Sequence, residues 1–110
     1  MLDIMNYIDA NITDGISLSS VAKKTGMSES KFSRRFAEMN GISFKQYVIK
    51  KKIQHAVKLM NTTNLKMIDV AMESGFDSIS GFYDAFKKTT GTTPKNFKLA
   101  NGDKTYEAEI

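Results

Sequence analysis

The sequence predicts an all-α domain built from two helix-turn-helix units. Apolar residues recur at helical spacing, and no segment alternates as a strand does. One pattern of features occurs twice, offset by 49 residues up to a glycine–apolar pair and by 50 residues after it. The first copy is Val21-Ala22, Gly26-Met27, Ser28, Phe32, Phe36, Gly41, Ser43 and Tyr47. The second is Val70-Ala71, Gly75-Phe76, Ser78, Phe82, Phe86, Gly91, Thr93 and Phe97. This order indicates an internal duplication, and we expect about seven helices in all.

The length and composition are those of one globular domain. A chain of 110 residues can bury one modest core, and an apolar content of 41 % argues against disorder throughout. No apolar run is long enough to cross a membrane, and the N-terminus carries acids rather than a basic signal segment. We expect the domain over residues 1–100 and a polar tail over residues 101–110.

The charge is concentrated in the body of the chain. The formal net charge is +4, but the last ten residues hold three acids and one lysine. Residues 1–100 therefore carry 15 basic and 9 acidic groups, a balance that favours an anionic partner. The chain has no cysteine, which removes disulfides, thiolate nucleophiles and cysteine zinc sites, and is consistent with a reducing cytoplasmic setting.

The first unit is expected to follow a short N-terminal helix. Residues 2–12 carry apolar side chains at helical spacing, namely Leu2, Met5, Ile8 and Ile12. Ser17 is a good N-cap for a second helix. Gly26 can then supply the positive φ that a tight turn between two helices needs.

A reading helix, whose outer face would meet the edges of DNA bases, follows from Ser28 to about Asn40. Its apolar stripe, within about 40° of Phe32 at 100° per residue, consists of Phe32, Phe36 and Met39. Its opposite side carries Ser30, Arg34 and Ala37. Small polar residues allow close approach to a major groove, and arginine can donate two hydrogen bonds to guanine. An ordinary amphipathic helix with a solvated basic face is the alternative, and the second copy makes it less favoured.

A long linker helix is expected next. Ser43 and Gln46 form a capping-box pattern at its start. Its buried positions are Tyr47, Ile53, Ala56, Val57 and Met60, and its lysines form mainly a solvated face. We place unit one at about 17–41, the linker at about 43–61 and unit two at about 66–91.

The second unit repeats the first. A short helix leads to the turn at Gly75-Phe76, and a second reading helix runs from about Ser78 to Thr90. Its inward residues are Phe82, Ala85, Phe86 and Thr89; its outward residues are Ser80, Tyr83, Asp84 and Lys87. Thr93-Pro94 starts a last short helix, from which Phe97 packs back on the body as Tyr47 does in unit one.

Over residues 5–98 the chain resembles the DNA-binding domain of AraC/XylS-family bacterial transcription regulators. The likeness is strongest in the second half, in Ala71, Gly75-Phe76, Ser80, Phe82, Phe86-Lys87, Gly91, Thr93-Pro94 and Phe97. The resemblance implies double-stranded DNA as the partner, with both reading helices in adjacent major-groove segments. It also implies contact with RNA polymerase, activation or repression of promoters, and in many members a separate sensing and dimerising domain. An excised output domain and a stand-alone regulator both fit the sequence.

The resemblance also implies which residues meet DNA. The expected base contacts are Ser30, Lys31, Ser33, Arg34, Ile79, Ser80, Tyr83 and Asp84. The expected phosphate contacts are Ser28, Arg35, Lys50, Lys51, Ser78 and Lys87. The chain departs from the family pattern at Lys52, which stands where arginine is usual, at Gly81 inside a reading helix, and at Asp84, whose carboxylate repels phosphate. We therefore expect unit one to supply most of the specific contacts.

Two other functions are less favoured by the sequence. Catalysis is disfavoured because the lone histidine, His55, has no nucleophile or metal-ligand pattern around it, and no cofactor or metal is expected. A helical protein-interaction module is the alternative function, suggested by six methionines. These are Met5, Met27, Met39, Met60, Met67 and Met72, for which core filling is the favoured role. The basic cluster of Lys31, Arg34 and Arg35 favours DNA.

Overall fold

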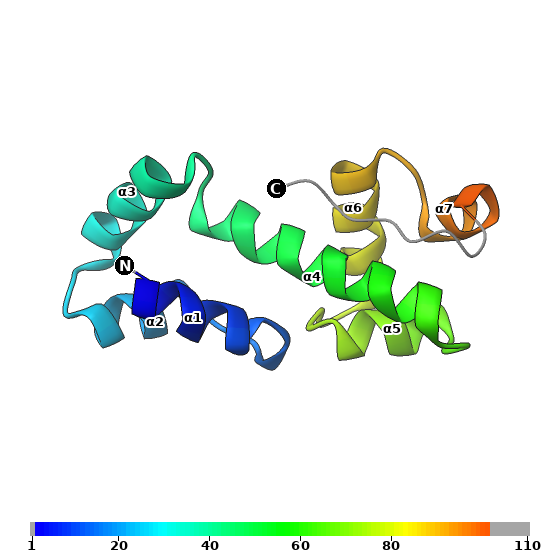
Figure 1. Ribbon diagram of the computed structural model, residues 1–110, viewed down its shortest axis with the longest axis horizontal. Coiled ribbons are helices and arrows are strands. Elements are labelled where there is room, and N and C mark those ends of the chain that lie inside the picture. Colours follow the sequence, from blue (N-terminus) through cyan, green and yellow to red (C-terminus); the bar gives the residue numbers. More distant parts are fainter. Residues whose placement is uncertain (1, 102–110) are drawn as a thin grey trace.

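The computed structural model describes residues 2–101, which form helices and turns without a strand among them (Figure 1). The helices of unit one and the linker are α1 Leu2–Ala10, the 3₁₀ helix η1 Ile12–Asp14, α2 Leu18–Thr25, α3 Glu29–Asn40 and α4 Phe44–Thr62. Those of unit two are α5 Met67–Glu73, α6 Ile79–Thr90 and α7 Pro94–Asn101. The prediction of an all-α fold is confirmed. The expected polar tail, beyond Asn101, lies outside the described residues.

The molecule is elongated, with one group of helices toward each end of α4 (Figure 1). Each group encloses a hydrophobic core. Its extents are 44 × 23 × 22 Å. The first half of α4 contributes Phe44, Tyr47 and Val48 to the core of unit one. The second half contributes Ile53, Ala56, Val57 and Met60 to the core of unit two. Each large apolar side chain buried in this way contributes about 1.5–3 kcal/mol, so α4 is held firmly by both units.

The duplication extends to the packing of aromatic rings. In unit one the rings of Phe36 and Tyr47 meet edge to face, with centroids 5.4 Å apart and an interplanar angle of 71°. In unit two the rings of Phe86 and Phe97 also lie 5.4 Å apart, at 84°. The prediction that Phe97 packs back as Tyr47 does is confirmed. Such pairs add about 0.5–1.5 kcal/mol beyond area burial.

The repeat is longer than the sequence pattern indicated. Ile4 and Ile8 of α1 are buried, and 49 residues later Ile53 and Val57 are buried in α4. The second half of α4 therefore occupies in unit two the position that α1 occupies in unit one. Each unit is a three-helix bundle, and α4 is both the linker and the first helix of unit two.

Three expectations for apolar residues are wrong. Met39 is 57 % exposed, because it lies at the rim of a hollow between α1, α2 and α3 rather than over the core. Met72 is 45 % exposed, because it lies about 200° from the buried Val70 on the outer side of α5. Core filling therefore fails for these two of the six methionines, although Met60 is buried. The first helix also ends earlier than expected, at Ala10, and the buried Ile12 lies in η1.

The helix ends follow the local signals of the sequence. The serines at the expected helix starts each accept a hydrogen bond from a backbone N–H in the first turn; they are Ser17, Ser28, Ser43 and Ser78. Gln46 completes the predicted capping box by accepting the N–H of Ser43 at 3.1 Å. Gly26 and Gly41 end α2 and α3 in the left-handed conformation. These caps fix where each reading helix begins and ends.

One hydrogen bond joins α4 to α1. The hydroxyl of Tyr47 donates to Oδ1 of Asp9 over 2.6 Å. Burial, together with this hydrogen bond and the negative charge of Asp9, raises the pKa of Tyr47 well above its ordinary value. The folded state therefore holds the phenol proton more tightly than the unfolded chain does.

We expect Tyr47→Phe to lower the free energy of unfolding by about 1 kcal/mol at neutral pH, since the ring stays and only the hydrogen bond is lost. Above about pH 10 the unfolded chain releases the tyrosine proton while the folded state keeps it, so the advantage of Tyr47 shrinks as pH rises. Urea unfolding of both proteins at pH 7 and pH 10.5 measures this. An advantage that is constant with pH would contradict the assignment.

A second prediction concerns Gly81, in the first turn of α6. Its N–H donates to Oγ of the cap residue Ser78 over 3.0 Å, and an added Cβ would lie 3.2 Å from the same oxygen. Alanine gains about 0.5–1 kcal/mol over glycine inside a helix, but here it also crowds the cap. We expect Gly81→Ala to stabilise a Ser78→Ala background by more than it stabilises the wild type. Thermal unfolding of the four proteins of the double-mutant cycle measures the difference, and equal gains would contradict the crowding.

Candidate nucleic-acid interface

The outer face of α3 is polar and open. Ser30, Lys31 and Arg34 are exposed, and Ser33 is half-buried. The opposite face buries Phe32 and Phe36 completely, which fixes the rotation of the helix. Ser28 is exposed at the helix start, and its Oγ accepts the N–H of Lys31 at 3.2 Å. Its hydroxyl proton stays available to a phosphate oxygen.

The outer face of α6 has the same geometry. Phe82 and Phe86 are fully buried, while Ser80, Tyr83, Asp84 and Lys87 are exposed and Ile79 is half-buried. The ring of Tyr83 lies 5.8 Å from that of Phe82, at 40°, and keeps 43 % of its surface exposed. The structure thus places the expected base-contact residues of each unit together on one helix face.

The two faces differ in charge. Among the expected base contacts, α3 carries Lys31 and Arg34 while α6 carries the carboxylate of Asp84. The positions of Arg34 and Asp84 are 50 residues apart, so they are equivalent in the two units. Lys87 and Lys88 lie one turn further along α6 and are exposed. Lys87 therefore adds a basic group to the outer face of unit two, about one turn beyond the carboxylate of Asp84.

Arg35 lies apart from the α3 face. It lines a hollow between α1, α2 and α3 with Asp3, Lys24, Met27 and Met39, among others. Arg35 and Arg34 are adjacent in sequence but point about 100° apart around the helix. This flank of α3 thus has an environment of its own, away from the outer face.

The lysines near the middle of α4 make separate contacts. The ammonium of Lys51 lies 5.5 Å from the centroid of the Tyr47 ring, in unit one. That of Lys52 lies 5.5 Å from the centroid of the Phe76 ring, in unit two. Lys50 lines a hollow between α4 and α6, together with Ala85 and Lys88. Contacts of this kind are worth about 0.5–1 kcal/mol when exposed, so Lys51 and Lys52 are not simply solvated.

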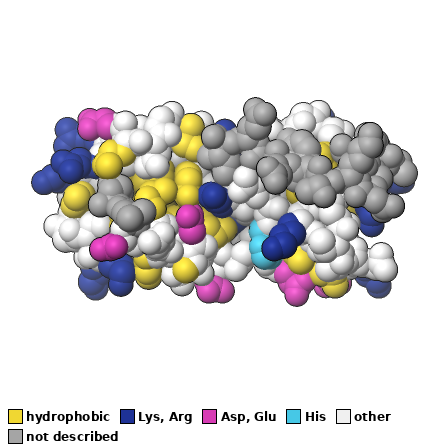
Figure 2. Space-filling view, viewed as in Figure 1, with side chains coloured by type: hydrophobic (Ala, Val, Ile, Leu, Met, Phe, Trp, Pro, Cys, Tyr) yellow, Lys and Arg dark blue, Asp and Glu magenta, His cyan; other side chains and the backbone are white. Residues whose placement is uncertain are grey.

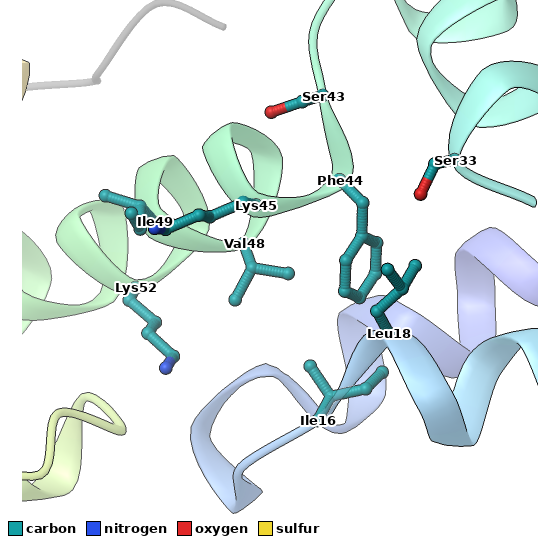
Figure 3. A pocket seen from close by; sticks show the side chains of 9 residues that line it. All are labelled: Ile16, Leu18, Ser33, Ser43, Phe44, Lys45, Val48, Ile49 and Lys52. Carbon is teal, nitrogen blue, oxygen red and sulfur yellow. The ribbon is translucent and has the colours of Figure 1, made fainter. Parts of the chain in front are cut away.

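An apolar hollow lies beside the half-buried Ser33, between the starts of α2 and α4 (Figure 3). Its lining consists of Ile16, Leu18, Ser33, Ser43, Phe44, Lys45, Val48, Ile49 and Lys52. Figure 3 shows Phe44 facing Leu18 and Ile16 across it, with Ser33 at its edge. In unit two the residue equivalent to Ser33 is Tyr83. Sequence reasoning missed this hollow, because its lining comes from positions that share no periodic pattern.

Metal-ligand clusters, membrane spans and the single histidine are described here for residues 2–101. Residues 2–101 hold no group of three or more His, Cys, Asp or Glu side chains placed to bind a metal ion. No helix among them is long and apolar enough to cross a membrane. His55 is half-buried in the middle of α4.

Figure 2 shows one broad face of the molecule. Hydrophobic side chains gather over its left half, where unit one lies, with lysine and arginine at the left edge. Among the described residues, the large apolar side chains that remain exposed are Met39, Ile68, Met72 and Tyr83.

Comparison with known proteins identifies the family. A helix-turn-helix domain family matches residues 21–100. The transcriptional activator AarP of Providencia stuartii is 31 % identical over 99 residues, which cover 90 % of this chain and 73 % of AarP. An uncharacterised helix-turn-helix-type transcriptional regulator of Staphylococcus aureus is 33 % identical over 95 residues, which cover 86 % of this chain and 13 % of that protein. The chain therefore spans a small part of the length of that relative.

Solved structures show the same fold. The C-terminal domain of the response regulator yesN from Fusobacterium nucleatum is 32 % identical, with a TM-score of 0.82 over 86 % of this chain and 93 % of that one. The DNA-binding domain of AdpA, solved in complex with a target DNA, has a TM-score of 0.84 at 22 % identity, covering 90 % and 89 % of the two chains. An AraC-type regulator from Chromobacterium violaceum has a TM-score of 0.77 at 21 % identity, covering 87 % and 86 %. The chain belongs to the AraC/XylS-type helix-turn-helix family of transcription regulators.

Proposed function

We propose that this chain binds double-stranded promoter DNA sequence-specifically, with α3 and α6 in adjacent major-groove segments. One observation carries the proposal: the same exposed helix face occurs twice, on two units joined by one continuous helix. Helix α4 has 19 residues and is about 28 Å long at ~1.5 Å per residue. The 44 Å length of the molecule leaves room for reading helices about 34 Å apart, one turn of B-DNA.

In this proposal unit one supplies most of the base recognition. Arg34 donates two hydrogen bonds to a guanine edge, and Lys31 stands beside it. Ser30 and Ser33 are small enough to let α3 approach the groove floor closely. The phosphate contacts proposed here are Ser28, exposed at the start of α3, and Lys50, which lines the hollow between α4 and α6.

Unit two contributes different chemistry. Asp84 accepts a hydrogen bond from the amino group of cytosine, and Ile79 and Tyr83 offer apolar contact to thymine methyl groups. Ser80 is a neutral partner for a base edge, while Ser78 and Lys87 bind phosphates. Lys51, held over the Tyr47 ring, is a further phosphate candidate. Arg35 is exposed on the flank of α3, in its separate hollow, and stays a phosphate candidate there.

The wider role follows from the family. Membership supports a bacterial promoter as the site of action, and hence the cytoplasm as the compartment. It also supports two further partners, RNA polymerase and a sensing or dimerising domain belonging to the same regulator. The relative AarP is named as a transcriptional activator, and this similarity favours activation over repression for this chain. Family membership favours a binding role over an enzymatic one.

Selection from randomised duplexes of ~30 base pairs tests the proposal directly. We expect two short sequence blocks about ten base pairs apart, and affinity for selected DNA well above that for scrambled DNA. Affinity for both should fall steeply with salt, because phosphate contacts release counterions. Equal affinity for selected and scrambled DNA at every salt concentration would overturn the proposal. Absence of all DNA binding would favour a protein-interaction module instead.

The unequal contribution of the units is tested by comparing Arg34→Ala with Asp84→Ala on the selected duplex. We expect Arg34→Ala to weaken binding by about 1–3 kcal/mol and to relax specificity at one position. Asp84→Ala should have the smaller effect, since it also removes a repulsion from phosphate. Arg35→Ala is the matched control, because it removes the same charge from the flank of the same helix. A larger loss from Asp84→Ala, or an equal loss from Arg35→Ala, would contradict these roles.

A further inference from the structure

The two units touch each other directly, apart from their connection through α4. Gly75, in the turn between α5 and α6, lies against η1 of unit one. A Cβ atom at Gly75 would lie 3.0 Å from Cα of Thr13 and 3.1 Å from the carbonyl oxygen of Ile12. Both are backbone atoms, which cannot move aside as the end of a side chain can. A side chain at this position would therefore be crowded and would push the two backbones apart by a few tenths of an ångström.

Gly75 differs in this respect from the other glycines with positive φ. Gly15, Gly26, Gly41 and Gly91 each have no heavy atom within 4 Å of an added Cβ. Gly26 is the counterpart of Gly75 in unit one, with φ of +72° against +96°. Both glycines satisfy the demand of a tight turn. Of these two glycines, only Gly75 also lies against the other unit.

Lys52 reinforces the same contact from α4. Its Cε would lie 3.2 Å from a Cβ at Gly75, and its ammonium stands 5.5 Å from the centroid of the Phe76 ring. Figure 3 shows Lys52 leaving α4 toward the space between the loop of unit one and the turn of unit two. The Phe76 ring in turn meets the ring of Phe82 at 5.4 Å and 60°. The contact is thus continuous from η1 to the base of reading helix α6.

We propose that this contact, made by Ile12, Thr13, Lys52, Gly75 and Phe76, holds α3 and α6 at one separation and rotation, and so sets the half-site spacing that the protein accepts. The inference rests on the proposed function, because spacing has meaning only if both helices bind DNA. Attachment through α4 alone leaves unit two free to twist and bend about one axis. A second contact away from that axis removes this freedom. We name these five residues the inter-unit contact.

The consequence for DNA follows from its helical geometry. Inserting one base pair between the half-sites moves the second by about 3.4 Å along the axis and rotates it by about 35° around the axis. A protein whose units are held rigidly loses simultaneous engagement when the spacing changes, and with it the gain from binding both half-sites. A protein whose units are loosely joined tolerates several spacings but binds each less tightly.

The test measures affinity for four duplexes: both selected blocks at the selected spacing, one base pair closer, one base pair further apart, and the first block alone. For the wild type we expect at least about tenfold preference for the selected spacing over either altered one. For Gly75→Ala we expect weaker binding at the selected spacing, a preference reduced to about twofold or less, and unchanged affinity for the first block alone. Circular dichroism confirms that each variant is folded.

Gly26→Ala is the matched control, because it also places alanine at a positive φ, in a turn where the added Cβ meets no heavy atom within 4 Å. It should keep the spacing preference of the wild type. Lys52→Ala, which keeps every backbone conformation, serves as the second variant should Gly75→Ala fail to fold. Lys58→Ala is its control, since it removes an exposed lysine of the same helix to which no DNA contact is assigned.

The outcomes separate the two proposals. A wild type without sequence preference would overturn the proposed function. A wild type that prefers its sequence but accepts all three spacings equally would overturn the role of the inter-unit contact. So would a preference that survives in folded Gly75→Ala and in Lys52→Ala. Loss of preference in these two variants, with retention in Gly26→Ala and Lys58→Ala, is the result that supports it.

Discussion

The burial of α4 by two cores at once is the constraint on which the rest of the molecule depends. Phe44, Tyr47 and Val48 enter the first core, while Ile53, Ala56, Val57 and Met60 enter the second. At 100° per residue, these two sets centre on directions roughly 180° apart around the helix axis. The two units are therefore anchored on opposite sides of one rigid element. Which residues of α4 are apolar thus sets the side of the helix on which each unit lies, and the inter-unit contact removes the twisting and bending that α4 alone allows.

Duplication has preserved the interior of each unit and changed its exterior. The pairs Phe36–Tyr47 and Phe86–Phe97 keep one ring geometry, and the cap serines keep one position at the start of each reading helix. On the outer faces the equivalent residues differ in kind, with Ser33 against Tyr83 and Arg34 against Asp84. Since the buried side fixes the rotation of the helix, an outer residue can change without moving its neighbours. One fold thus supports two different chemistries at the DNA.

Local signals made most of this fold predictable from the sequence. Serine caps, glycine stops and phenylalanines at helical spacing act within one or two turns, so they predicted the bounds and inner faces of α3 and α6. Exposure depends on what other elements cover, and for that reason Met39 and Met72 were misplaced. The apolar pattern of α4 changes sides halfway along, which hid its equivalence to α1. The approach of Gly75 to Thr13 was not predicted, because these residues lie far apart in the chain. The tight turn was already a sufficient reason for a glycine at that position.

The inter-unit contact allows unit two to contribute to specificity although its own contacts with DNA are weak. A face that carries Asp84 gains little binding free energy on its own, because its carboxylate is repelled by phosphate. If unit two is held rigidly beside unit one, however, it meets its half-site at no further cost in orientational freedom once α3 is bound. A small favourable contact between unit two and its half-site then adds almost its full free energy to binding. A mismatched half-site weakens binding by nearly the full cost of the mismatch. Rigidity between the units therefore converts a modest second contact into discrimination, whereas a flexible joint would let unit two lift away from the wrong sequence without penalty.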